Sequence, residues 1–271
     1  MHRVGFILGT VLNINAKNIN PNIYFNGAVT QFPFVKSVGY NSDFYQKGSL
    51  NSKPSNYVTI PTSKQLYPQQ LLKFYAQKEV AQNLLDSNPV LKEKLQANGL
   101  EATVHPESVT SISSSHLRTT TAYALQIANA MNLSSADKKV LEQACVFHDF
   151  GKILIPTEVL NKPGELTPEE KKVMDLHADF GYELLSSTNI DKRVLNLVKN
   201  HHMPQAANND ILGQILSVAD IYSALREQRS YKQPLTQKEA MQILDQKAQK
   251  GEVSTEVVNT LKSVVINSLA A

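Results

Sequence analysis

The sequence predicts an all-α fold, a helical bundle preceded by a largely irregular N-terminal segment. From about residue 64 onward, apolar residues recur at helical spacing, and several of these segments begin at typical N-capping residues. No segment shows the sustained alternation of a β-rich domain. Residues 13–63 are instead rich in Asn, Ser, Gly and Pro, which predicts a poorly ordered or irregularly packed leader.

These patterns divide the chain into three parts: an irregular leader over 1–63, a helical linker over 64–105 and a helical domain over 106–271. In the linker, one helical segment follows Pro68, and a short helix lies within "NPVLKEKLQANG", where a glycine ends it.

Capping signals mark three helices of the third part. Thr167 is an N-cap followed by Pro168 at the first helical position and by Glu170, its capping-box partner. Ser134 and Thr236 are N-caps of the same kind. We expect helices over about 107–131, from Ser134 to Gly151, from Thr167 to about Ser187, near 191–201, over 211–226, after Thr236, and over about 254–269.

Bulk composition is that of a soluble globular protein, with 42% hydrophobic and 19% charged residues. The net charge is +3 without a Lys/Arg block, so neither nucleic-acid nor membrane binding is predicted. The single cysteine, Cys145, excludes an internal disulfide and fits a reducing compartment. Gly5, Gly9, Thr10 and Asn13 interrupt the short apolar N-terminal stretch, so we expect a cytoplasmic protein, with export as the alternative.

Five of the seven histidines fall on predicted helices, and helical spacing directs them toward the core. His116 shares a face with Thr120 and Ile127, for example, and His177 shares one with Phe180 and Leu184. The inward set comprises His116, His148, His177, His201 and His202, together with Asp149 and Asp220.

Each of these residues has a plain structural explanation by itself. A lone histidine on an apolar face is usually a satisfied core residue, and Cys145 fits a small core hydrophobe. Burying seven ionisable groups together is costly unless they are paired or bound to metal. Imidazole and carboxylate are ligands of first-row transition metals, and a carboxylate can be shared by two ions. The set therefore predicts a metal centre.

The order of these residues resembles the HD superfamily of metal-dependent phosphohydrolases, and more closely its HD-GYP branch of bacterial cyclic di-GMP phosphodiesterases. The segments "HDFGKILIPTEVLNKPGELTPEE" and "VADIYSALREQRSYKQPL" are similar to that branch's segments around the HD pair and the last Asp. The resemblance covers about residues 106–250 and implies an HD-domain bundle with a signalling phosphodiesterase activity.

The resemblance also implies residue roles. Asp149 would bridge two divalent ions, iron or manganese in the family, although the ligand chemistry alone also admits zinc or nickel. Lys152 would contact the substrate phosphate or the metal-bound hydroxide. The first ion would be held by His116, His148, Asp149 and Asp220, the second by Asp149, His177, His201 and His202, and the phosphate also by Arg229 and Lys232. Without the resemblance, we would interpret Lys152 as a cation favoured at a helix C-terminus. Arg229 and Lys232 would be interpreted as a solvated pair at a helix end.

The sequence departs from the family pattern in two places. Some members hold a third metal with a Glu one turn before the first histidine, where this chain has Ile112, so two metals are implied. Only seventeen residues separate His202 from Asp220, and none of them form the Gly-Tyr-Pro signature. The missing loop leaves the metal ligands intact but removes a part of the family's substrate pocket.

Three functions follow from these observations. The first is hydrolysis of a nucleotide, most directly a cyclic dinucleotide such as cyclic di-GMP, by attack of a metal-bridging hydroxide. The second is a catalytically silent HD signalling or binding domain, which the complete ligand set argues against. The third is a di-iron HD oxygenase, which the phosphate-contacting cations argue against.

Overall fold

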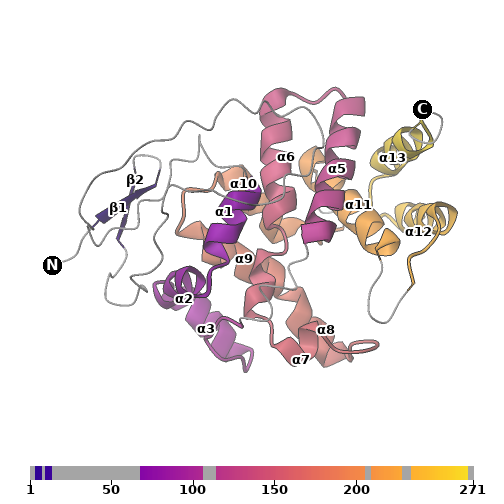
Figure 1. The fold of residues 1–271 in the computed structure, drawn as a ribbon. Helices are drawn as coiled ribbons and strands as arrows, with labels where there is room; N and C mark the ends of the chain where they lie inside the picture. Colours follow the sequence, from indigo (N-terminus) through magenta and orange to yellow (C-terminus); the bar gives the residue numbers. More distant parts are fainter. Residues whose placement is uncertain are drawn as a thin grey trace.

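The computed structural model describes residues 4–7, 10–13, 68–105, 114–204, 209–227 and 233–267. Within these ranges the fold is almost entirely helical, which confirms the predicted class (Figure 1). A short antiparallel hairpin of β1 (Val4–Ile7) and β2 (Thr10–Asn13) was not predicted from the sequence. Its four-residue strands are too short for a two-residue period to be recognised. The rest of the predicted leader lies outside the described residues.

The predicted linker contains three short helices, and all three pack on the main bundle. The segment expected as one helix after Pro68 is divided, because Gln77 adopts an extended conformation, and a second helix begins after it. Asn88 caps the third by accepting a hydrogen bond from Leu91 N at 2.9 Å. These helices are α1 (Pro68–Tyr75), α2 (Lys78–Asp86) and α3 (Pro89–Ala97). The first contacts α6 (Ser135–Phe147), and the other two contact α9 (His177–Ser186).

Three long helices form the centre of the bundle: α5 (Ser114–Ala130), α6 (Ser135–Phe147) and α11 (Ile211–Arg226). The helix α5 packs against both others, and Ile127, Leu141 and Leu216 are fully buried in their shared core. Two of these helices begin where the sequence predicts, α6 after the Ser134 cap and α11 after Asp210. The predicted start of the first helix near residue 107 lies outside the described residues.

The segment after α6 is more divided than the sequence predicts. The helix expected to reach Gly151 ends earlier and is followed by a 3-10 turn. The helix expected from Thr167 to Ser187 has the predicted capping box but is interrupted at Leu176. The observed elements are η2 (Phe150–Leu154), α7 (Thr157–Leu160), α8 (Pro168–Asp175), α9 (His177–Ser186) and α10 (Lys192–Asn200).

A close backbone approach joins η2 to α9. A Cβ atom on Gly151 would lie 2.0 Å from the carbonyl oxygen of His177 and 2.4 Å from the amide nitrogen of Gly181. Both distances are far shorter than a non-bonded contact, so only glycine fits at residue 151. This contact places the residues that end α6 beside the first residue of α9.

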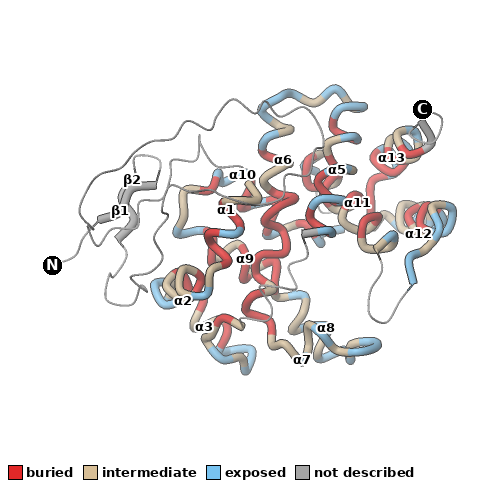
Figure 2. Tube along the Cα trace, in the orientation of Figure 1, coloured by how far each residue is buried: buried red, intermediate tan, exposed pale blue. Residues whose placement is uncertain are grey.

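Two C-terminal helices complete the described fold, α12 (Gln237–Gln249) with the predicted Thr236 capping box and α13 (Thr255–Asn267). They pack against α11 and α5, respectively. Buried residues lie along the inner sides of α5, α6 and α9, while the outer turns of α3 and α12 are exposed (Figure 2). Among the described helices, none combines the length and apolar character needed to cross a bilayer.

Candidate metal centre

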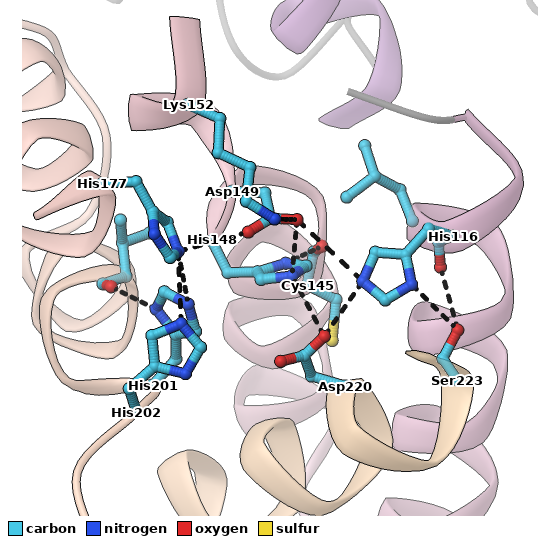
Figure 3. A network of polar contacts seen from close by, with 12 residues as sticks. His116, Cys145, His148, Asp149, Lys152, His177, His201, His202, Asp220 and Ser223 are labelled. Carbon is cyan, nitrogen blue, oxygen red and sulfur yellow. Dashed lines mark hydrogen bonds and ion pairs between the residues drawn. The ribbon is translucent and has the colours of Figure 1, made fainter. Parts of the chain in front are cut away.

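Seven candidate ligands from five helices converge at one place in the bundle (Figure 3). Most of them occupy helix ends, where the backbone turns and brings side chains of different helices together. His116 lies on α5, His148 caps α6 and precedes Asp149, His177 begins α9, His201 caps α10 and precedes His202, and Asp220 lies on α11.

The ligand atoms fall into two halves. The aspartate half consists of His116, His148, Asp149 and Asp220, and the histidine half consists of His177, His201 and His202. The atoms of His116, His148 and Asp149 lie within 4.8 Å of one another, as do those of the histidine half. Asp220 joins the first half because its Oδ1 lies 2.9 Å from His116 Nε2 and 3.6 Å from His148 Nε2.

Asp149 faces both halves. Its Oδ2 lies 3.5 Å from His148 Nε2 and 4.0 Å from His116 Nε2, within the aspartate half. Its Oδ1 lies 3.3 Å from His177 Nε2, in the histidine half. Lys152, from the turn after the HD pair, donates to Oδ2 at 2.7 Å. One carboxylate thus presents one oxygen to each half.

Backbone carbonyls orient three of the imidazoles. In each case Nδ1 lies within hydrogen-bond distance of the carbonyl three residues earlier, and a carbonyl can only accept, so Nδ1 carries the proton. The other ring nitrogen, Nε2, then points toward the centre. The three bonds join His148 to Cys145 O at 2.8 Å, His177 to Met174 O at 2.6 Å and His201 to Val198 O at 2.7 Å.

The inward direction predicted for five histidines is correct for four of them. His116, His148, His177 and His201 are buried. His202 is exposed, because it follows the end of α10 and lies in the turn, outside the helix face that was used to place it. Its Nε2 still lies 3.2 Å from His177 Nε2, so it contributes to the histidine half from the edge.

The two carboxyls remain ionised. Burial by itself raises the pKa of Asp149, but the Lys152 ammonium and the neighbouring His148 and His177 rings lower it well below its usual range. Burial also raises the pKa of Asp220, but the neighbouring His116 and His148 rings lower it well below its usual range. Both residues are therefore carboxylates at neutral pH, the form that ligates metal.

His148 differs in protonation from the adjacent pair His201 and His202. Burial, together with the neighbouring His202, holds the pKa of His201 well below its usual range. Burial and the nearby His177 lower the pKa of His202 to about 4. In the aspartate half, burial lowers the pKa of His148, but Asp149 and Asp220 more than offset it and raise the pKa to about 9.

These donors fit divalent metal ions. His148 Nε2 is fully buried and has no hydrogen-bond partner among the described residues. Leaving a buried polar atom without a partner costs about 1–3 kcal/mol of folding free energy. His177 Nε2 and His201 Nε2 lie 3.2 Å apart while both rings already donate through Nδ1, so two lone pairs face each other. A cation satisfies these nitrogens together, and imidazole and carboxylate suit transition metals.

Other residues of the predicted site have mixed outcomes. Lys152 lies at the centre, with a side chain that is 25% exposed. Cys145 is fully buried, and burial raises the pKa of its thiol, which confirms a core residue. Ile112, Arg229 and Lys232 lie outside the described residues.

One contact of the centre was missed by sequence reasoning. Ser223 was not among the predicted site residues. Its Oγ lies 3.2 Å from His116 Nδ1. Its position three residues after Asp220, on the same face of α11, was the available signal.

The chain matches the model of a family described as "HD domain" over residues 79–256. The chain belongs to the HD domain family. The matched region of this HD chain begins inside the predicted linker, so α3 and most of α2 fall within it. Proteins of this kind that act as phosphohydrolases depend on metal, in accord with the two groups of possible ligands.

Curated relatives of this HD chain are named as cyclic dinucleotide phosphodiesterases, in accord with the HD-GYP branch. It is 31% identical over 150 residues to the 3'3'-cGAMP-specific phosphodiesterase 2 of Vibrio cholerae, covering 50% of this chain and 28% of the relative. It is 35% identical over 130 residues to the cyclic di-GMP phosphodiesterase response regulator RpfG of Xanthomonas campestris, covering 44% and 34%. The chain thus spans about a third of the length of these relatives.

A solved structure supports the fold. The chain superposes on an HDG"Y"P protein from Bdellovibrio bacteriovorus with a TM-score of 0.51 and 15% identity, covering 73% of this chain and 69% of the other. At this identity the likeness concerns the arrangement of helices alone.

Proposed function

We propose that this chain is a cytoplasmic, metal-dependent phosphodiesterase that hydrolyses a cyclic dinucleotide such as cyclic di-GMP. Its relatives carry that activity in their names. The observation that carries the proposal is the orientation of Asp149, whose Oδ1 and Oδ2 face different groups of histidines. A shared carboxylate between two sets of ligands is the arrangement of two-metal hydrolytic sites.

In this proposal the chain holds two divalent ions, iron or manganese. The aspartate half would hold one and the histidine half the other, with Asp149 common to both. When bound, such a pair supplies hydroxide at neutral pH and withdraws charge from a phosphate oxygen. The low pKa of Asp149 keeps its carboxylate free of a proton and available to both halves.

Lys152 is the described cation closest to the centre, with its Nζ 2.7 Å from Asp149 Oδ2 and its side chain partly exposed. We assign it a second task. Its ammonium would contact a non-bridging oxygen of the bound diester and neutralise charge that grows there during displacement. Arg229 and Lys232 remain predicted phosphate contacts of the same kind.

The substrate pocket would be open beside the histidine half. Only eight residues, Met203 to Asp210, connect His202 to the first residue of α11. Met203, the first of them, is 39% exposed. A connection this short cannot wrap a large ligand, so the pocket would accept a phosphodiester while holding its bases weakly.

The decisive experiment is product analysis with metal-loaded protein. The chain is loaded with Mn²⁺, or with Fe²⁺ without oxygen, and incubated with cyclic and linear dinucleotides. We expect linear dinucleotide from the cyclic substrates, no product with Asp149→Asn, and full activity with Asp175→Asn, which alters an exposed carboxylate of α8.

The competing functions give different results in the same assay. Binding of the dinucleotide without hydrolysis would indicate a silent signalling domain. Oxygen consumption by the iron-loaded protein, without cleavage of any phosphodiester, would indicate an oxygenase. Either result would overturn the proposed function.

A further inference from the structure

His116 differs from the other buried histidines in the partner of its Nδ1 atom. The rings of His148, His177 and His201 each donate to a backbone carbonyl of their own helix. His116 Nδ1 lies instead 3.2 Å from Ser223 Oγ, a side chain of α11 that is 107 residues away in the chain. Figure 3 shows Ser223 on the side of the ring opposite Asp220.

Ser223 is held in place by a second hydroxyl. Its Oγ lies 2.5 Å from Thr119 Oγ1, and Thr119 donates to the carbonyl oxygen of His116 at 3.0 Å. Ser223 itself is 2% exposed, so water does not compete for its hydroxyl. The hydroxyls therefore form a short chain from the ring of His116 back to its own backbone.

The directions of these hydrogen bonds can be deduced if His116 ligates metal through Nε2. The ring proton must then lie on Nδ1, and Nδ1 donates to Ser223 Oγ. Ser223 donates in turn to Thr119, and Thr119 donates to the carbonyl of His116. Every hydroxyl in this arrangement donates once and accepts from its neighbour, so no buried proton is left unpaired.

We propose that Ser223 is a positioning residue of the metal centre, which accepts the Nδ1 proton of His116 and so directs the Nε2 lone pair of this ring into the aspartate half. Ser223 does this for His116 as the backbone carbonyls do for the other three rings. A partner on the outer nitrogen of a metal-bound histidine fixes its tautomer and orientation, and its loss costs about 10–100-fold in metal affinity. The inference rests on the proposed function, because it requires an ion in the aspartate half.

Glu227 is the competing partner. Its Oε2 lies 3.6 Å from His116 Nδ1, and its side chain is 22% exposed. That distance is beyond a hydrogen bond, whereas 3.2 Å to Ser223 is within reach of one. Glu227→Gln should therefore leave metal affinity unchanged.

The test compares Ser223→Thr with Ser223→Val, which add the same bulk and differ only in the hydroxyl. Metal is removed stepwise by a competing chelator, and the ions that remain are counted. We expect Ser223→Val to lower the affinity of the aspartate half for its ion by about tenfold or more relative to Ser223→Thr. The ion of the histidine half should be unaffected and serves as an internal control.

A spectroscopic reading separates positioning from mere helix packing. In the Zn²⁺-loaded protein, the Nδ1 proton of His116 should appear in proton–nitrogen correlation spectra of the wild type and of Ser223→Thr. It should exchange and disappear in Ser223→Val. Thr120→Val is the matched control, because Thr120 is buried on α5 and its hydroxyl has no partner among the described residues.

The outcomes distinguish this inference from the proposed function. If the wild type takes up no ion, both are wrong. If the wild type takes up two ions and Ser223→Val matches Ser223→Thr in affinity and spectrum, only the role of Ser223 is wrong.

Discussion

The two halves of the candidate centre are built from similar ligands but differ in charge and support. The aspartate half contains both carboxylates and lies on α5, α6 and α11, the centre of the bundle. The histidine half has three imidazoles and no carboxylate of its own, and it lies at the ends of α9 and α10. Coulomb attraction to a divalent ion is therefore stronger in the aspartate half.

The halves also differ in how they are exposed. The ligands of the aspartate half are buried or nearly so, whereas the histidine half ends in the exposed His202 beside a short connection. An ion held by neutral ligands at an open edge leaves more easily than one held by two buried carboxylates. The ligands of the aspartate half therefore suit tight retention of an ion, whereas the histidine half lies at an open edge.

The largest effect is expected where the halves share a residue. Asp149→Ala removes an oxygen ligand from each half at once, since Oδ1 and Oδ2 face different sets of histidines. We expect metal content to fall from close to two ions per chain to nearly none, and hydrolysis to be lost. Elemental analysis of chelator-free preparations measures this. Retention of one full ion by the variant would show that Asp149 belongs to a single half.

Metal removal should separate the halves. A native-state ligand present at about a thousand times its Kd adds about 4 kcal/mol to the free energy of unfolding. Chelation should therefore lower the Tm of the wild type clearly and in two steps. The ion of the histidine half should be released first. In His177→Ala/His201→Ala only the second step should remain.

A melting curve of the wild type that chelator leaves unchanged would contradict a metal centre built into the fold. If the ion of the aspartate half were released first, the order inferred from charge would be wrong.

A smaller effect concerns substrate choice at the open edge. Because the connection after His202 is short, we expect little discrimination between cyclic di-GMP and a simple chromogenic diester, within about tenfold in kcat/KM. Steady-state kinetics on both substrates measure this. A micromolar KM for cyclic di-GMP with a strong preference over the simple diester would show that another segment closes the pocket.

The smallest effect concerns the outer support of the histidine half. Lys94 of α3 lies 2.6 Å from both Asp179 Oδ2 and Glu183 Oε1 of α9, the helix that begins with His177. These side chains are partly exposed, so Lys94→Met should cost only about 0.5–1 kcal/mol of unfolding free energy. Urea unfolding measures this against Lys171→Met, which removes a more exposed pair within α8 and should cost less. Equal losses would show that α3 gives α9 no special support.

Local rules were enough to predict most helix starts and the burial of most candidate ligands. Ser134, Thr167 and Thr236 cap the helices they were expected to cap, because a cap involves residues three apart in the chain. The 3.6-residue period placed His116 and His177 on buried faces for the same reason. The roles of these residues as ligands remain predictions.

Contacts between helices were decided only by the tertiary structure. The break at Leu176, which makes His177 the first residue of α9, lies where Gly151 and Gly181 bring η2 against that helix. The division of Asp149 between the two halves likewise depends on where separate helices meet.

The hydrogen bond between Ser223 and His116 is the clearest case. It joins residues 107 positions apart and exists only because α5 packs on α11. A helical period gives the face of a side chain, but the partner on that face is chosen by packing between elements that are distant in the chain. The sequence by itself therefore determined most of the residues that are buried at the centre, and the packing of the helices decided what each of them meets there.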